Sequence, residues 1–371
     1  MRYRIHFSLS IAAAIALNTA SALPGSWTQK NDVGFHQPNG PLSRMGAVSF
    51  VVGSKAYVGF GQGPASPYFD DLWEFDPGTN SWAQKASLTG GGRYLGVAFA
   101  IGTKGYVGTG WLNGPPLWGQ DFWEYDPGSN TWAAKATFPG AGRNGAVGFA
   151  IGTKGYIGTG TTSVSEVADM WEYDPNTDAW TAKAAHGGGT RSSSYVFVVG
   201  GNAYIGAGSY AGFGLQTDLW CFDPVADSWT AKAGAPMVAR YGASGFAIGS
   251  TGYVVNGSDG SNYFGDLFAY DTVLDAWTPK AAVPIGGRVF AVAFAVGGYG
   301  YTGTGGTSFP AYTDVWRYDP GANSWTARTG LGGTDRFGAI YFAIGGKGYI
   351  GMGLVNGGVQ TDLWEFDPGT G

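Results

Sequence analysis

The sequence predicts an all-β protein, a seven-bladed β-propeller whose blades are four-stranded antiparallel sheets. Three observations support this prediction: glycines recur beside aromatic residues, one unit of sequence repeats seven times, and each unit contains four short strand-like segments separated by turns. Glycine accounts for 67 of the 371 residues, and aromatic residues for 16%. Periodic glycine and aromatic motifs are typical of repeated β-blades.

An arginine opens each unit and recurs at intervals of 48 to 50 residues, close to the period of about 50 residues known for one class of propeller blade. Each arginine is followed by a tyrosine, then by an aspartate two residues before a tryptophan or phenylalanine. Repetition at this length indicates one blade per unit. The seven arginines are Arg44, Arg93, Arg143, Arg191, Arg240, Arg288 and Arg336.

The second unit shows how each blade is expected to form. An apolar run over 97–101 predicts the innermost strand, a, and Tyr106 lies on strand b after a glycine-rich turn. Strand c carries Trp123, and strand d carries Trp132 after a turn containing Asp, Pro, Gly and Asn. Short strands joined by such turns form an antiparallel meander, which is one propeller blade.

Ring closure is expected to use the N-terminal part of the chain. The seventh unit stops at Gly371 before its strand d tryptophan, whereas Trp27 and Lys30 form an unpaired strand d pattern ahead of the first arginine. We therefore expect this N-terminal strand to complete the last blade, because closure removes exposed sheet edges. The alternative is a chain whose C-terminal part is missing.

Residues 1–22 have the features of a signal peptide, with Arg2 and Arg4 ahead of an apolar stretch and small residues up to Ala22. We expect cleavage there, which leaves the propeller over 23–371, secreted or periplasmic. The cleaved chain carries 19 Lys and Arg against 26 Asp and Glu, a balance that disfavours nucleic acid as a partner. No later segment has the ~20 apolar residues of a membrane span, so no membrane insertion is expected.

The repeat resembles the kelch family in its arginine, its tyrosine before glycines, and its Trp-Glu-Tyr-Asp-Pro-x-Thr-x-x-Trp segment. The resemblance covers 26–369 and implies a seven-bladed propeller. One difference is that the usual pair of adjacent glycines after strand b is interrupted here, as in Gly108-Thr109-Gly110. The chain therefore resembles a divergent branch of the family, whose functions transfer poorly.

Galactose oxidase is a copper enzyme built on such a propeller, and its metal centre needs two histidines, two tyrosines and a linked cysteine. Here His36, His186 and Cys221 lie in separate repeats, so we expect no metal and no other cofactor. Each histidine is interpreted as a solvated loop residue. The single cysteine is interpreted as a packed strand residue.

Strand direction places the arginines, the b–c loops and the aspartates before strand c on one face, which we call the b–c loop face. Two interpretations of the arginines follow. In the first, each arginine pairs with an aspartate and serves the fold, because a group present in all seven blades serves the repeat. In the second, Arg93, Arg143 and Arg240 lie at the mouth of the central channel and attract an anionic ligand.

The b–c loops differ most between units, and variable loops on a rigid scaffold are where ligands bind. Aromatic side chains in these loops suit stacking on sugar rings or anchoring a protein partner. Trp111 and Trp118 share one loop and are the strongest candidates. The other candidate ligand-binding residues of the loops are Tyr68, Tyr210, Tyr263 and Tyr312.

These features predict an exported, monomeric, non-catalytic recognition module that binds an extracellular glycan or protein through the b–c loop face. One alternative is a sugar-modifying enzyme, similar to mutarotases or epimerases, that uses the arginines at the channel mouth. Glu166 is the one glutamate of the b–c loops, which leaves little acid–base equipment there. Another alternative is the propeller part of a larger surface protein. The repeated glutamates of strand c are interpreted as solvated: Glu74, Glu124, Glu172 and Glu365.

Overall fold

The computed structural model describes residues 27–31, 44–63, 67–210, 214–307, 311–328, 330–355 and 358–368. The expected signal peptide and His36 lie outside these residues. The described residues form strands and turns, and none of them belongs to a helix able to cross a bilayer.

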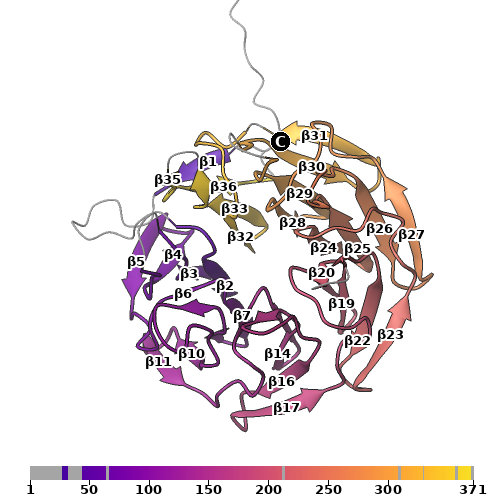
Figure 1. Cartoon of the computed structure of the whole chain (residues 1–371). Coiled ribbons are helices and arrows are strands. Elements are labelled where there is room, and N and C mark those ends of the chain that lie inside the picture. Colours follow the sequence, from indigo (N-terminus) through magenta and orange to yellow (C-terminus); the bar gives the residue numbers. More distant parts are fainter. Residues whose placement is uncertain are drawn as a thin grey trace, which may run out of the picture.

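Seven four-stranded antiparallel sheets surround a central channel, which confirms the predicted propeller (Figure 1). We number the blades 1 to 7 in the order of their arginines, from Arg44 to Arg336. In each blade, strand a lies beside the channel and strand d at the outer rim (Figure 1).

Strands of one kind occupy the same place in every blade. Strands a are β2 (Val48–Val52), β7 (Val97–Ile101), β13 (Val147–Ile151), β18 (Tyr195–Val199), β24 (Ser244–Ile248), β28 (Val292–Val296) and β32 (Ile340–Ile344). Strands b are β3 (Lys55–Gly59), β8 (Lys104–Gly108), β14 (Lys154–Gly158), β19 (Asn202–Gly206), β25 (Thr251–Val255), β29 (Tyr299–Gly303) and β33 (Lys347–Gly351). Strands c are β4 (Leu72–Asp76), β10 (Phe122–Asp126), β16 (Met170–Asp174), β22 (Leu219–Asp223), β26 (Leu267–Asp271), β30 (Val315–Asp319) and β36 (Leu363–Phe366). Strands d are β5 (Ser81–Lys85), β11 (Thr131–Ala134), β17 (Ala179–Lys183), β23 (Ser228–Lys232), β27 (Ala276–Lys280), β31 (Ser324–Arg328) and β1 (Trp27–Lys30).

Shorter strands occur in the b–c loops and in the segments that precede strands a. They pair as β6 (Arg93–Tyr94) with β9 (Trp111–Leu112), β12 (Arg143–Asn144) with β15 (Thr161–Thr162), β20 (Ser209–Tyr210) with β21 (Gly214–Leu215), and β34 (Leu354–Val355) with β35 (Gly358–Val359).

The N-terminal strand closes the ring, as predicted. β1 pairs antiparallel with β36, so that Trp27 lies opposite Phe366. On the b–c loop face, the N–H of Gly353 in blade 7 donates to the carbonyl of Arg44 in blade 1 at 2.9 Å. The N-terminal strand therefore completes the sheet of blade 7, and a backbone hydrogen bond joins that blade to blade 1.

The hydrophobic core lies between neighbouring blades. Phe50 of blade 1 lies against the backbone of Gly105 in blade 2, where a Cβ atom would come within 2.1 Å of the phenyl ring. Glycine at this point allows the ring to approach the next blade closely. Trp132 of blade 2 donates its indole N–H to the carbonyl of Ala86 at 2.7 Å. Tryptophans of strands d thus fill the space between blades.

The glutamates of strand c are not solvated, so that interpretation was wrong. Glu74 and Glu365 are each 6% exposed. Glu74 accepts a hydrogen bond of 2.6 Å from the Tyr57 hydroxyl, and Lys85 lies 3.1 Å from its carboxylate. Because the adjacent blade covers this surface, the carboxylate depends on partners within its own blade.

Cys221 is buried on β22, as predicted, but the interpretation of His186 was wrong. His186 is 3% exposed and packs against Trp229, with ring centroids 4.6 Å apart. The segment after strand d turns inward between blades, and Leu88 and Phe138 occupy the same place in other blades. Burial, with the charge of nearby Arg191, lowers the pKa of His186 to about 3.

We expect His186→Leu to reduce the acid sensitivity of the fold. The imidazole titrates at about pH 3 when folded and near 6.5 when unfolded. The unfolded chain therefore binds an extra proton between these values, so the free energy of unfolding falls as the pH drops below about 6.5. Between pH 6.5 and 5 this one group costs about 2 kcal/mol. Urea unfolding of both proteins across this range measures the difference, and parallel pH profiles would contradict the prediction.

Candidate functional site

Seven arginine–aspartate pairs fix the b–c loop face. In blade 3, the two terminal nitrogens of Arg143 bind both carboxylate oxygens of Asp169, and Nη1 also donates to the carbonyl of Thr159 at 3.0 Å. Trp171 donates its indole N–H to the same carboxylate at 2.8 Å. The other pairs are Arg44–Asp71, Arg93–Asp121, Arg191–Asp218, Arg240–Asp266, Arg288–Asp314 and Arg336–Asp362.

This geometry supports the first interpretation of the arginines and corrects the second. Arg93, Arg143 and Arg240 are fully buried, and each also donates to a backbone carbonyl. Their guanidinium groups lie inside the blades and offer no surface to an anion at the channel mouth. Burial by itself would raise the pKa of Asp169, but Arg143 holds that pKa below its ordinary value, which keeps the pair ionised.

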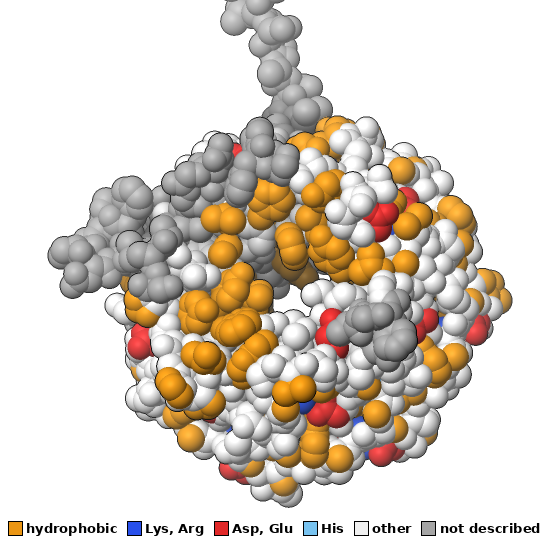
Figure 2. Space-filling view, viewed as in Figure 1, with side chains coloured by type: hydrophobic (Ala, Val, Ile, Leu, Met, Phe, Trp, Pro, Cys, Tyr) orange, Lys and Arg blue, Asp and Glu red, His pale blue; other side chains and the backbone are white. Residues whose placement is uncertain are grey.

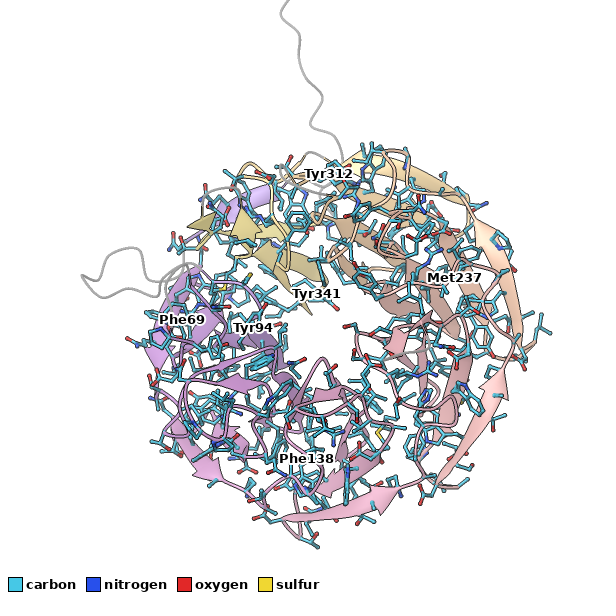
Figure 3. All side chains as sticks on the ribbon, in the orientation of Figure 1. Phe69, Tyr94, Phe138, Met237, Tyr312 and Tyr341 are labelled. Atoms are coloured by element: carbon cyan, nitrogen blue, oxygen red, sulfur yellow. The ribbon has the colours of Figure 1, made fainter. Side chains whose placement is uncertain are left out.

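The residue after each arginine pairs with a residue at the beginning of the b–c loop of its blade. In blade 2, Tyr94 lies opposite Trp111, and Trp111 lies opposite Trp118. Residues opposite one another in antiparallel strands point to the same side, so these three rings form a row. The corresponding row of blade 1 ends at Tyr68. Tyr94 lies beside the central channel (Figure 3).

Four aromatic side chains from blades 1 and 2 form one surface, which we call the aromatic platform: Tyr68, Tyr94, Trp111 and Trp118. The rings of Tyr68 and Tyr94 stack with centroids 5.7 Å apart, and those of Trp111 and Trp118 lie 4.1 Å apart. All four side chains are partly exposed. The side chain of Asn113 joins the two blades here through hydrogen bonds to the Tyr68 backbone. Figure 2 shows hydrophobic side chains gathered at this side of the channel.

A polar cluster occupies the corresponding loops of blades 3 and 4. Glu166 accepts hydrogen bonds from the hydroxyl groups of Ser192 and Ser209 at 2.7 and 2.8 Å. Glu166 is 8% exposed, so these bonds hold its carboxylate in place. Blade 3 follows blade 2 in the ring, so the polar cluster comes next after the aromatic platform in the order of the blades, with Glu166 and Ser192 buried.

The channel is hollow between these blades. A cavity of about 300 Å³ lies between the strands a of blades 1 to 4, and small side chains keep it open. Its lining includes Ser49, Ala98, Gly148, Ser194 and Val196. A second cavity, of about 550 Å³, lies beside the blade 2 loop, with Leu112, Pro116 and Trp123 in its lining. The second cavity is lined in part by the loop that carries the platform tryptophans.

The second residue after each arginine has a positive φ in every blade. Four of the seven are glycines, which adopt this conformation without strain. Leu95, Ser193 and Phe290 adopt it with φ of 55°, 55° and 54°. Leu95 is 40% exposed and Phe290 53% exposed. Exposed apolar side chains on a strained backbone are typical of binding surfaces, because packing does not account for them.

The structure places the predicted loop residues in different surroundings. The structure brings Trp111, Trp118 and Tyr68 together. Tyr263 is 36% exposed on the blade 5 loop. The Tyr312 ring stacks on the guanidinium group of Arg288 at 4.7 Å, so it packs against a buried arginine. The side chain of Tyr210 lies outside the described part of the chain.

Sequence reasoning missed the first and second residues after the arginines. Tyr94, Leu95 and Phe290 were interpreted as part of the repeat because they lie within two residues of the arginine that opens every unit. The available signal was their variation: Tyr94 in blade 2 corresponds to Asn144 in blade 3 and Ser192 in blade 4. A position that varies next to one that does not change is a candidate for ligand contact.

The fold and the b–c loop face define the chain as a seven-bladed β-propeller. No family model and no curated protein matches the sequence. Solved structures do match, among them the structure of YjhT, with a TM-score of 0.56 and 16% sequence identity over 88% of this chain and 95% of that chain. At this level of identity the similarity shows the fold alone.

We expect Arg143→Ala to lower the free energy of unfolding by about 3–5 kcal/mol, because Asp169 loses the partner of its partly buried charge. Lys154→Ala is the matched control. It removes an ion pair with Asp174 in which the side chains are 30% and 24% exposed, and it should cost less than about 1 kcal/mol. Chemical denaturation measures both variants, and equal losses would show that the buried pair has no special role.

We expect Leu95→Gly to raise the free energy of unfolding by about 0.5–1 kcal/mol, because glycine adopts a positive φ without the steric cost that leucine meets. Gly338→Ala is the converse change at φ 58°, with open space around the position, and should lower stability by a similar amount. Thermal unfolding of the two variants should therefore shift in opposite directions. A loss of stability in Leu95→Gly would mean that the leucine side chain serves packing.

Proposed function

We propose that this chain is a secreted, non-catalytic recognition module of the kelch type that binds neutral carbohydrate at the channel mouth of the b–c loop face. The observation that supports this best is the aromatic platform followed around the ring by the polar cluster of Glu166, Ser192 and Ser209. Export is supported by the signal-like segment at 1–22.

Carbohydrates match this combination of groups. A sugar ring presents an apolar face that stacks on aromatic side chains, and hydroxyl groups at its edge that donate and accept hydrogen bonds. Trp111 and Trp118 supply the first kind of contact. The carboxylate of Glu166 is a strong acceptor for hydroxyl donors.

The charges near the platform favour a neutral ligand over an anionic one. The arginines of the b–c loop face are buried and neutralised by aspartates. The carboxylate of Glu166 would repel a second carboxylate or a sulfate group. We therefore place uncharged hexose-type glycans first among ligands.

A sugar-modifying enzyme at the same place receives less support. In the described part of the chain, no group of three or more His, Cys, Asp and Glu side chains could hold a metal ion. Glu166 is the one carboxylate of the polar cluster, whereas proton transfer at sugar carbons or oxygens commonly uses an acid and a base together.

We expect Trp118→Ala and Tyr94→Ala each to weaken binding of a glycan identified on a neutral glycan array by about tenfold or more, because stacking of one aromatic ring contributes roughly 1–2 kcal/mol. Isothermal titration calorimetry of the purified chain measures the affinities. The sugar itself should be recovered without chemical change.

Tyr263→Ala is the matched control, since Tyr263 occupies the position of Trp118 in the blade 5 loop, away from the platform. It should change affinity less than twofold. Equal losses in Tyr263→Ala and Trp118→Ala, or unchanged binding in both platform variants, would place the ligand elsewhere. Capture of a protein instead of a glycan by the same surface would replace carbohydrate with a protein partner.

A further inference from the structure

Four blades share a buried cluster of one tyrosine, one glutamate and one lysine on strands b, c and d. In blade 1 the carboxylate of Glu74 accepts a hydrogen bond from Tyr57 and lies 3.1 Å from the ammonium group of Lys85. Lys55 also donates to this carboxylate at 2.8 Å, so in blade 1 one carboxylate serves a phenol donor and two cations. The same cluster recurs as Tyr106–Glu124–Lys135, Tyr156–Glu172–Lys183 and Tyr349–Glu365–Lys30.

Blade 6 reverses the charge at the centre of this cluster. Its three positions hold Tyr301, Arg317 and Arg328. Strands β29, β30 and β31 keep the register of the other blades, so that Tyr301 lies opposite Arg317 as Tyr57 lies opposite Glu74. A second cation therefore stands where four blades have their acceptor.

Three polar atoms of the blade 6 cluster are buried without a hydrogen-bond partner among the described residues. Tyr301 is fully buried and Arg328 is 5% exposed. The Tyr301 hydroxyl and the Nε atoms of Arg317 and Arg328 have no hydrogen-bond partner among the described residues. Burial raises the pKa of Tyr301 to about 12, so its hydroxyl remains a donor. Buried donors and charges without partners are costly, and native proteins rarely retain them.

The surroundings hold these groups in place without neutralising them. The guanidinium group of Arg317 lies 4.2 Å above the ring of Tyr299, and the ring of Tyr301 packs against Phe366 of blade 7. Asp319, on the same strand as Arg317, accepts a hydrogen bond from the turn amide of Gly321 at 2.9 Å. Arg328 lies opposite Val315, which shares a face of β30 with Arg317, so the two cations are neighbours on one side of the sheet. Burial and the like charge of Arg317 lower the pKa of Arg328.

We propose that Arg317, Arg328 and the hydroxyl of Tyr301 bind a small oxyanion, which supplies the acceptor oxygens that glutamate supplies in four other blades. Guanidinium groups bind phosphate, sulfate and carboxylate oxygens in a planar, two-pronged arrangement. The ligand would occupy the outer part of the boundary between blades 6 and 7. This site is separate from the aromatic platform and does not depend on the carbohydrate proposal.

Arg317→Glu gives the sharpest test because it rebuilds the cluster of the other blades and so should fold. The whole chain is titrated calorimetrically with sodium phosphate, sodium sulfate and sodium acetate in low-chloride buffer. We expect one oxyanion per wild-type chain and at least a tenfold loss of affinity in Arg317→Glu. Binding of phosphate or sulfate alone identifies a tetrahedral ligand, and binding of acetate identifies a carboxylate.

Lys104→Glu is the control for the change of charge. This substitution also replaces a cation with an anion, but at a side chain that is 31% exposed and pairs with Asp126. The Lys104→Glu variant should bind the oxyanion as the wild type does. Sodium chloride at matched ionic strength should not bind in place of the oxyanion. The proposal is overturned if wild type and Arg317→Glu respond equally to all three salts, or if Lys104→Glu loses binding to the same extent as Arg317→Glu.

Discussion

The buried arginine of each blade is the constraint on which the rest of the b–c loop face depends. In blade 3, the side chain of Arg143 binds Asp169 at the start of strand c and the carbonyl of Thr159 after strand b. Thr159 has a positive φ, which turns its carbonyl towards the arginine. The backbone carbonyl of Arg143 accepts the N–H of Gly110 from blade 2 at 2.7 Å. One residue therefore fixes both ends of its own b–c loop and the position of the preceding blade.

The loops gain freedom because their ends are fixed. The arginine and the aspartate neutralise each other inside the blade, so only a few loop side chains serve the fold, as Tyr312 does by stacking on Arg288. Blade 2 uses this freedom for Trp111 and Trp118, and blade 3 uses it for Glu166. The backbone pairing of Tyr94 with Trp111 shows that the position next to the arginine contributes to the same surface as the loop. Differences in sequence among the b–c loops thus change the surface of this face, whereas the arrangement of the blades stays the same.

The sequence predicted the fold well because the repeat presents the same local pattern seven times, and ring closure follows once Trp27 is recognised as a displaced strand d. It predicted the site only partly. The interpretations of Glu74 and His186 as solvated were wrong because their burial comes from the adjacent blade, which no pattern within one repeat reveals. Tyr94 was missed because its pairing with Trp111 joins segments that lie far apart in the repeat. Contacts within a strand are visible in sequence, whereas contacts between strands and blades require register and ring geometry.

Departures from the repeat differ in their physical consequences. This difference distinguishes a neutral substitution from a proposed binding site. Cys221 and Ala269 replace the strand c glutamate in blades 4 and 5, and each removes a charge without adding one. The remaining cation in those blades is a partly exposed lysine, whose ammonium group water can hydrate. Arg317 instead adds a charge beside Arg328, which has almost no access to solvent. Water has little access to Arg328, and the Nε atoms of both arginines have no hydrogen-bond partner among the described residues. Among the three exceptions, it is therefore blade 6 whose electrostatics call for a bound anion.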